Sequence, residues 1–236
     1  MKTLLLKLKG PLQSWGVASR YRTRATHTEP TKSGIIGLLA AAQGRERTAD
    51  ISDLAELEFG VRVDQPGTLE RDFQTALEPK AKNPNLSYRY YLADAVFLAA
   101  VAGPDDVIDG LATAVKTPVY PLYLGRRSCP ANADLFLGVH EGGVEETLRA
   151  QPWHAAAWHK ATRTDPAFLP LFRDARENEK GNSLRDTPTS FAQENRMYYW
   201  RVVHEAAPVK VENSANKNLA ADKHPVDPYF ETVNHP

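Results

Sequence analysis

Hydrophobic and polar residues alternate along the first segment of the chain, residues 2–9. Leu4, Leu6 and Leu8 fall on one side of this segment, which predicts a β-strand with one strongly buried face. A glycine and a proline follow directly, and they end the strand because such a pair favours a turn.

Two later segments carry the three- and four-residue spacing of an amphipathic helix. The first begins after Thr31, a favourable N-cap residue, and ends at Gly44. The second begins at Pro104 and carries two aspartates in its first turn, where negative charge complements the helix dipole. A shorter helix is expected at 52–58.

Strand-like hydrophobic segments follow at 59–64, 95–102 and 135–139. Residues 68–93 form two extended segments around a polar tip, which predicts an inserted, projecting hairpin arm. Without the arm the order is βαββαβ. We therefore predict an α+β fold with a ferredoxin-like layout, in which two helices cover one face of an antiparallel sheet. RNA-recognition modules share this RRM-like layout and leave the other face open to RNA.

The pattern weakens after residue 140. Residues 197–205 are rich in aromatic and β-branched types and predict a strand, whereas the charged residues 173–187 predict a loop. The expected organisation is a ferredoxin-like domain at 1–139, a small β-rich C-terminal subdomain at 140–207 and a polar tail at 208–236.

Charge is distributed unevenly along a chain whose formal net charge is zero. Residues 1–47 hold nine Lys/Arg against two Asp/Glu, and residues 48–78 hold two against eight. Such a chain can present a basic face to nucleic acid and acidic faces to protein partners. The neutral total argues against an indiscriminate binder of polyanions.

A cytoplasmic protein is expected from the single cysteine, which excludes an internal disulfide framework and suits a reducing compartment. No stretch has the length of a membrane span. Lysines interrupt the hydrophobic run at the start of the chain, and no small-residue cleavage site follows, which argues against a signal peptide.

The stretch 120–130, YPLYLGRRSCP, concentrates candidate binding chemistry. Gly125 allows a backbone to approach a ligand closely, and Arg126 and Arg127 offer planar forks that suit phosphate oxygens. Neighbouring tyrosines can stack on bases. The stretch is therefore either a loop that holds a nucleic-acid backbone or an ordinary surface turn with two solvated arginines.

Residues 11–30 mix arginines with aromatic residues, the composition of a single-stranded nucleic-acid surface. Trp15 is expected to plug the core rather than to stack on a base. Lys32 opposes the helix dipole at the start of the first helix, which would be explained by a phosphate bound there.

The sequence contains few residues in arrangements typical of catalytic sites. Neither a zinc-binding spacing nor a nucleophile motif occurs, and His154 and Cys129 are expected to serve packing. A metal-free RNA cleavage site could draw on His27, Tyr21 and Lys32, although a binding role is favoured for them. No catalytic residue, metal ligand or cofactor is assigned.

Four motifs in order resemble one family: GPLQSWG after the first strand, PTKSGIIGLLAAAQG on the first helix, YRYYLADA before a central strand, and PLYLGRRSCP before LFLG. Together they resemble the CasD subunits of the type I-E CRISPR Cascade complex, which belong to the repeat-associated mysterious protein (RAMP) superfamily. The resemblance covers residues 1–139 and returns in weaker form around 187–203.

The resemblance implies a non-catalytic subunit that binds and caps the 5′ handle of the guide RNA (crRNA). The arm would act as a thumb where handle and guide meet. The implied neighbours are the backbone filament subunit and the large subunit, and target DNA is reached only through the complex. The residues implied to bind RNA are Gln13, Trp15, Arg24, Lys32, Ser33, Arg89, Tyr123, Gly125, Arg126 and Arg127.

Two alternatives remain open at this stage. One is a metal-independent endoribonuclease of the same fold that processes CRISPR repeat RNA. The other is a small-molecule enzyme that binds no RNA, which the neutral net charge supports.

Overall fold

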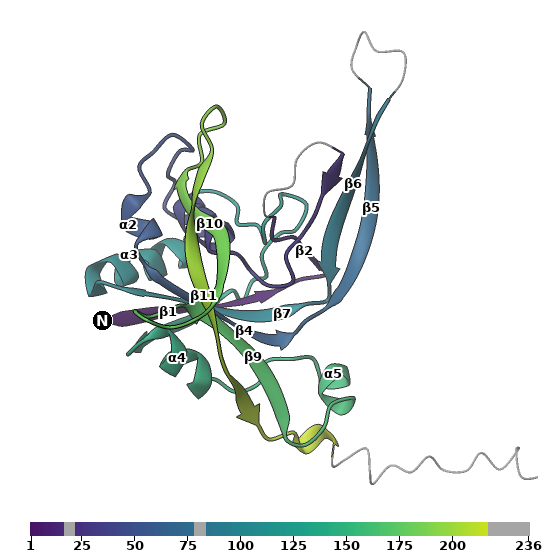
Figure 1. Cartoon of the computed structure of the whole chain (residues 1–236), viewed down its shortest axis with the longest axis vertical. Helices are drawn as coiled ribbons and strands as arrows, with labels where there is room; N and C mark the ends of the chain where they lie inside the picture. The colour runs from purple at the N-terminus through teal and green to yellow at the C-terminus, as the bar shows by residue number, and fades with distance from the viewer. Residues whose placement is uncertain (17–21, 78–83, 217–236) are drawn as a thin grey trace, which may run out of the picture.

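A seven-stranded sheet forms the centre of the protein in a computed structural model, which describes residues 1–16, 22–77 and 84–216 (Figure 1). Its strand order is β10-β11-β9-β4-β7-β1-β8. The strands are β1 (Lys2–Lys9), β4 (Glu58–Gln65), β7 (Val96–Gly103), β8 (Phe136–Glu141), β9 (Ala167–Asp174), β10 (Asn182–Ser190) and β11 (Met197–Val211). The strands predicted in the first 140 residues are thereby confirmed in type and approximate position.

Two helices, α1 (Lys32–Ala42) and α3 (Asp105–Lys116), cover one face of this sheet. Their buried residues pack with Leu4, Leu6 and Leu8 of β1 in one hydrophobic core. Thr31 caps α1 as predicted, since its hydroxyl accepts a hydrogen bond from the Gly34 N–H (3.2 Å). The short helix α2 (Ser52–Ala55) leads into β4.

The opposite face of the sheet is covered as well, unlike the open face of RNA-recognition modules. The helix α4 (Val144–Ala150) packs there with Leu5 and the segment around Trp153. Arg62 reaches this layer fully buried, pairs with Asp64 (2.7 Å) and donates to the Leu148 carbonyl (2.7 Å). The central strands β1 and β7 therefore do not offer RNA an open surface of the kind that RNA-recognition modules use.

The hairpin arm consists of β5 (Thr68–Ala76) and β6 (Asn85–Ala93) and projects from the main sheet (Figure 1). Two short strands flank its base, β2 (Leu12–Gln13) antiparallel and β3 (Thr23–Arg24) parallel to β6. The expected polar tip, 79–85, lies largely outside the described residues. The arm thus belongs to a second, smaller sheet beside the main one.

The strands after residue 140 extend the main sheet and form no sheet of their own, because β9 pairs with β4. The expected loop 173–187 is also wrong for most of its length, since Arg173 lies in β9 and residues 182–187 lie in β10. The expected tail begins within β11, which continues to Val211; residues 217–236 lie outside the described part.

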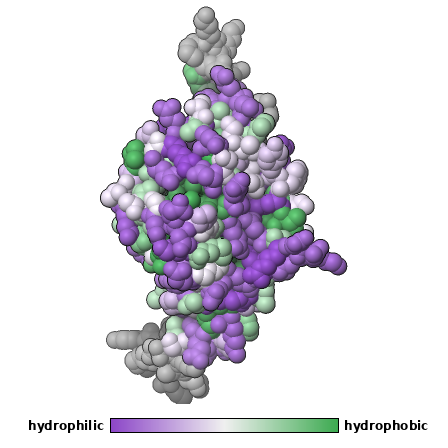
Figure 2. Space-filling model, turned by 90° about the vertical axis from the view of Figure 1, so that its left-hand side faces the viewer, coloured by the Kyte–Doolittle hydropathy of each residue, from purple (hydrophilic) through white to green (hydrophobic). Residues whose placement is uncertain are grey.

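The surface facing the viewer in Figure 2, on the side of α2, α3 and α4 in Figure 1, is mostly hydrophilic, with small scattered hydrophobic groups. The remaining helix, α5 (Ala157–Ala161), lies beside the lower end of β9. None of the helices in the described part of the chain is long and hydrophobic enough to cross a membrane.

Candidate nucleic-acid interface

A groove of about 700 Å³ lies between α1, the 120–127 loop and the hairpin of β10 and β11. Its charged lining is almost entirely cationic, with a single acidic residue, Glu46. The arginines that line it are Arg45, Arg47, Arg126, Arg127 and Arg196. We call this site the basic groove. Guanidinium groups in a concave site suit the oxygens of a phosphate backbone.

Arg126 is the arginine of the basic groove that contacts the base of the arm. Its guanidinium lies over the Tyr91 ring at 4.8 Å, and its Nη2 donates to the Arg24 carbonyl (2.8 Å). Its Nη1 has no hydrogen-bond partner among the described residues. Arg126 thus links the 120–127 loop to the base of the arm.

Gly125 serves the chain's own packing. Its φ is +87°, and a Cβ there would lie 1.8 Å from the Ser14 carbonyl oxygen. The Ser14 N–H donates to the Leu124 carbonyl (3.1 Å), so the 120–127 loop and the segment after β1 run in direct contact. The close approach expected for a ligand at this glycine is already made by the Ser14 backbone.

Gln13 and Trp15 are fully buried, which contradicts the implied RNA contact of their side chains. Gln13 donates to the Leu8 and Ala95 carbonyls (3.1 and 2.8 Å) and accepts from the Trp15 indole N–H (3.1 Å). The interpretation of Trp15 as a core plug is confirmed, since its ring packs in the core against Gly34. These two residues shape the groove from within.

Lys32 is also buried, and no phosphate is needed to explain its position. Its Nζ pairs with Asp174 (3.1 Å), and its backbone N–H donates to Asp186 (2.8 Å). Arg201 bridges the same two carboxylates, at 2.7 Å to Asp174 and 2.6 Å to Asp186. The anion at the start of α1 is therefore a carboxylate of this chain, which corrects the prediction.

The other implied residues lie at or near the groove. Ser33, Tyr123 and Arg127 line it. Arg24 is exposed on β3, directly opposite Arg89 on β6, and Arg89 Nε has no hydrogen-bond partner among the described residues. The structure thus gathers Ser33, Tyr123, Gly125, Arg126 and Arg127 at one site and sets the Arg24–Arg89 pair beside the arm base.

Sequence reasoning did not name three arginines and two aromatic residues of the lining, namely Arg45, Arg47, Arg196, Phe191 and Tyr198. The surplus of basic residues in 1–47 pointed toward the first two. Arg45 is held by Asp53 through two nitrogens (2.5 Å each), which leaves Arg47 the freer of the pair. The last three come from the hairpin of β10 and β11, whose position above α1 only the fold reveals.

The residues considered for RNA cleavage do not assemble into a site. Lys32 is ion-paired and buried, and Tyr21 lies outside the described residues. His27 Nδ1 lies 2.9 Å from Glu29, and this carboxylate raises the pKa of His27. The raised pKa favours the protonated form of His27, which suits phosphate binding better than proton abstraction.

The candidates assigned to packing behave as expected. The His154 backbone N–H donates to Asp64 (2.6 Å), and burial lowers the pKa of the His154 side chain. His159, in the following helix, sits edge-on to the Trp153 and Trp158 rings. Cys129 is buried, which raises the pKa of its thiol and makes it a weak nucleophile. Within the described residues no cluster of three potential metal-ligating side chains of His, Cys, Asp or Glu occurs.

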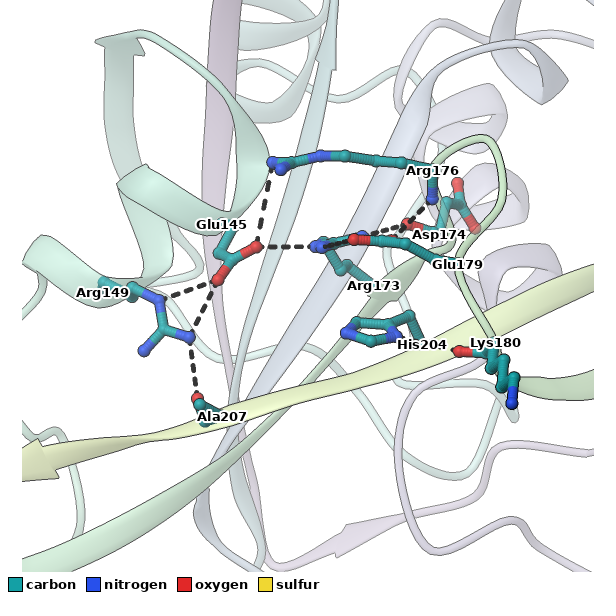
Figure 3. Close-up of polar contacts among 9 residues, drawn as sticks. All are labelled: Glu145, Arg149, Arg173, Asp174, Arg176, Glu179, Lys180, His204 and Ala207. Carbon is teal, nitrogen blue, oxygen red and sulfur yellow. Dashed lines mark hydrogen bonds and ion pairs between the residues drawn. The ribbon is translucent and has the colours of Figure 1, made fainter.

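A second charged cluster lies between α4 and the turn that joins β9 to β10 (Figure 3). Glu145 pairs with Arg149 (2.8 Å) and Arg173 (2.7 Å), and Glu179 binds Arg173 through both oxygens (2.6 and 2.8 Å). Arg176 approaches Glu145 at 3.8 Å. Each charge has an opposite partner, so this cluster fixes the turn and does not compete with the basic groove for anions.

The family model described as CRISPR-associated protein (Cas_Cas5) matches residues 3–204. The chain belongs to this family. The CRISPR system Cascade subunit CasD of Escherichia coli (strain K12) is 38% identical over 156 residues, which cover 57% of this chain and 70% of that protein. The resemblance to the CasD family is therefore confirmed.

Two solved structures share the fold. A chain of a structure titled "CRISPR RNA-guided surveillance complex" is 33% identical, with a TM-score of 0.76 over 90% of this chain and 92% of that one. A "Crystal structure of Cas protein" is 37% identical, with a TM-score of 0.68 over 90% of this chain and 96% of that one. Mixed α+β architecture with antiparallel sheets is common to this chain and these Cas proteins.

Proposed function

We propose that this chain is a non-catalytic subunit of a CRISPR Cascade surveillance complex and that it binds and caps the 5′ handle of the guide RNA in the basic groove. The observation that carries this proposal is the gathering of five arginines in one groove of a family member. RNA backbones bind such grooves mainly through phosphate contacts, and neighbouring aromatic rings add stacking.

The layout of the first 141 residues supports a ferredoxin-like core. The strands β8, β1, β7 and β4 lie side by side in this order, and α1 and α3 cover the same face. The arm, an insertion between β4 and β7, would then act as a thumb on the RNA and on the backbone filament subunit. Exposed hydrophobic residues on β5, Leu69 and Phe73, support a protein contact for the arm.

The large subunit is the second protein neighbour in this proposal, and target DNA is reached only through the complex. The complex would assemble in the cytoplasm. The division into a domain at 1–139 and a C-terminal part at 140–207 remains a prediction about folding units, because the two parts share one sheet.

The test is purification of the tagged chain from its host, followed by sequencing of bound RNA and identification of bound proteins. Enrichment of repeat-derived 5′ ends together with other Cascade subunits is the expected result. Recovery of the chain without RNA would contradict the proposal and favour a small-molecule ligand. Cleavage of repeat RNA in EDTA by the purified chain would instead establish the endoribonuclease alternative.

A further inference from the structure

Large side chains stand at every second position of β11 from Tyr198 onward, in a row that begins in the basic groove and leaves it. Tyr198, Trp200 and Val202 are two residues apart, with successive side chains about 6.6 Å apart along the strand. Trp200 and Val202 point away from the side on which Arg201 binds Asp174 and Asp186, and an irregularity in the pairing with β10 separates Trp200 from Tyr198. Tyr198 lines the groove, whereas Trp200 is 67% exposed and Val202 is 41% exposed. We call these three residues the aromatic row.

The aromatic row lies near an edge of the molecule. It is carried by the second strand of the main sheet, and its only outer neighbour is β10. Trp200 does not stand alone on this strand, because Met197, Tyr199 and Val202 are also exposed, and gathered exposed hydrophobic residues mark a binding surface. Trp200 therefore has the position and exposure of a binding residue.

The charges beside the row indicate what it binds. Arg185 on β10 is directly opposite Trp200, so both side chains lie on the same face. Its Nε donates to the Tyr198 carbonyl (3.0 Å), which holds the guanidinium along the row. Arg196, two residues before Tyr198, lines the groove. Aromatic rings flanked by arginines form the stacking surface that single-stranded nucleic acids use.

We propose that Trp200 is a base-stacking platform for single-stranded RNA that extends beyond the basic groove. One end of the RNA lies in the groove; the chain then follows β11, with a base against the Trp200 indole and the adjacent phosphate on Arg185. A protein partner is the less favoured occupant, because the row leads out of a groove whose charged lining is five arginines and one glutamate, which suits a phosphate backbone. This inference rests on the proposed RNA-binding function.

The experiment measures binding of 5′-labelled RNA, about 16 nucleotides long and copied from the host's CRISPR repeat, to the full chain by fluorescence anisotropy. Trp200→Ala is expected to weaken binding at least about fivefold, and Trp200→Phe is expected to restore most of the affinity, because a ring remains for stacking. The matched control is Trp158→Ala, which removes a 59% exposed indole on α5 that is not part of the groove lining. It should bind as the unmodified chain does.

A second readout reports the contact directly. In a Trp158→Phe background, Trp200 is the exposed tryptophan, since Trp15 and Trp153 are buried. RNA is expected to quench its emission in parallel with the anisotropy change. Anisotropy binding without quenching, and with Trp200→Ala unaffected, would overturn the stacking platform while leaving the proposed function intact. If Trp200→Ala abolished subunit assembly but left RNA affinity unchanged, the stacking platform would also be overturned and the row would be assigned to a protein contact. If the unmodified chain bound no RNA at all, both the stacking platform and the proposed function would be overturned.

Discussion

The backbone N–H of Lys32 donates to Asp186 Oδ2 over 2.8 Å, although the two residues are 154 positions apart. Arg201 binds the same carboxylate through Nε (2.6 Å) and Nη2 (3.0 Å). Asp186 therefore joins the start of α1 to the hairpin of β10 and β11. Since this hairpin supplies Arg196 and Tyr198 to the basic groove, one buried carboxylate fixes the distance between two of its walls.

Removal of this carboxylate should destabilise the protein and loosen the groove. Asp186→Ala removes one of the two carboxylates that pair with the largely buried Arg201 guanidinium. Breaking a buried ion pair in this way lowers the free energy of unfolding by roughly 3–5 kcal/mol. Urea unfolding should show this loss in the free energy of unfolding. Asp186→Asn keeps an acceptor for the Lys32 N–H and should lose less. Equal stability of the alanine variant and the unmodified chain would contradict the assigned role.

Arg126 and Arg127 should contribute to RNA affinity through their positive charge. Arg126→Ala combined with Arg127→Ala is expected to weaken guide-RNA binding and to lower the slope of log K against log salt by about 1.4, because two phosphate contacts are lost at about 0.7 each for a single strand. Titrations at several salt concentrations measure this slope.

A double variant with the same loss of charge provides the control. Arg149→Ala with Arg176→Ala removes two arginines of the cluster in Figure 3, away from the basic groove. Its salt slope should match that of the unmodified chain. An equal drop in both double variants would mean that net charge, and not the groove, governs binding.

Two glycine substitutions should have opposite effects on stability. Gly125→Ala places a Cβ 1.8 Å from the Ser14 carbonyl oxygen at a φ of +87°, and such strain costs about 1–3 kcal/mol. Gly110→Ala meets nothing within 4 Å in α3 and should stabilise the helix by up to about 1 kcal/mol. Thermal unfolding of both variants measures the contrast. A neutral Gly125→Ala would show that the 120–127 loop can move away from Ser14.

Local sequence patterns sufficed for most individual elements because their causes are local. The leucine alternation in β1, the Thr31 cap and the two aspartates that open α3 each act within a few residues. The covered second face did not follow from such patterns. Leu5 lies on the side of β1 that was expected to be less buried, and what buries it is α4, more than 130 residues later in the chain.

The residues of the candidate site also divide into those with a local sequence signal and those without one. Arg126 and Arg127 were found because they stand in one short stretch with glycine and tyrosine. Lys32 was misjudged because the carboxylates that bind it, Asp174 and Asp186, come from distant strands that no local pattern brings near α1. Arg196 was missed for the same reason. Long-range pairing of β9, β10 and β11 with the first half of the chain decides these contacts.

Acidification should remove the stabilising contribution of one ion pair, Lys7–Asp134, near the edge of the main sheet. The Lys7 ammonium, with Asn132, lowers the pKa of Asp134 from 3.8 to about 2. Because the folded pKa lies below the unfolded one, the pair stabilises the protein fully above about pH 4, and this contribution disappears as the pH falls from about 4 to 2. Urea unfolding of the unmodified chain and of Asp134→Asn over this range measures it. The two proteins should differ at pH 6, by less than about 1 kcal/mol since Asp134 is exposed, and should converge at pH 2. A difference that persists unchanged at pH 2 would mean that the side chain stabilises the edge through its hydrogen bonds and not through its charge.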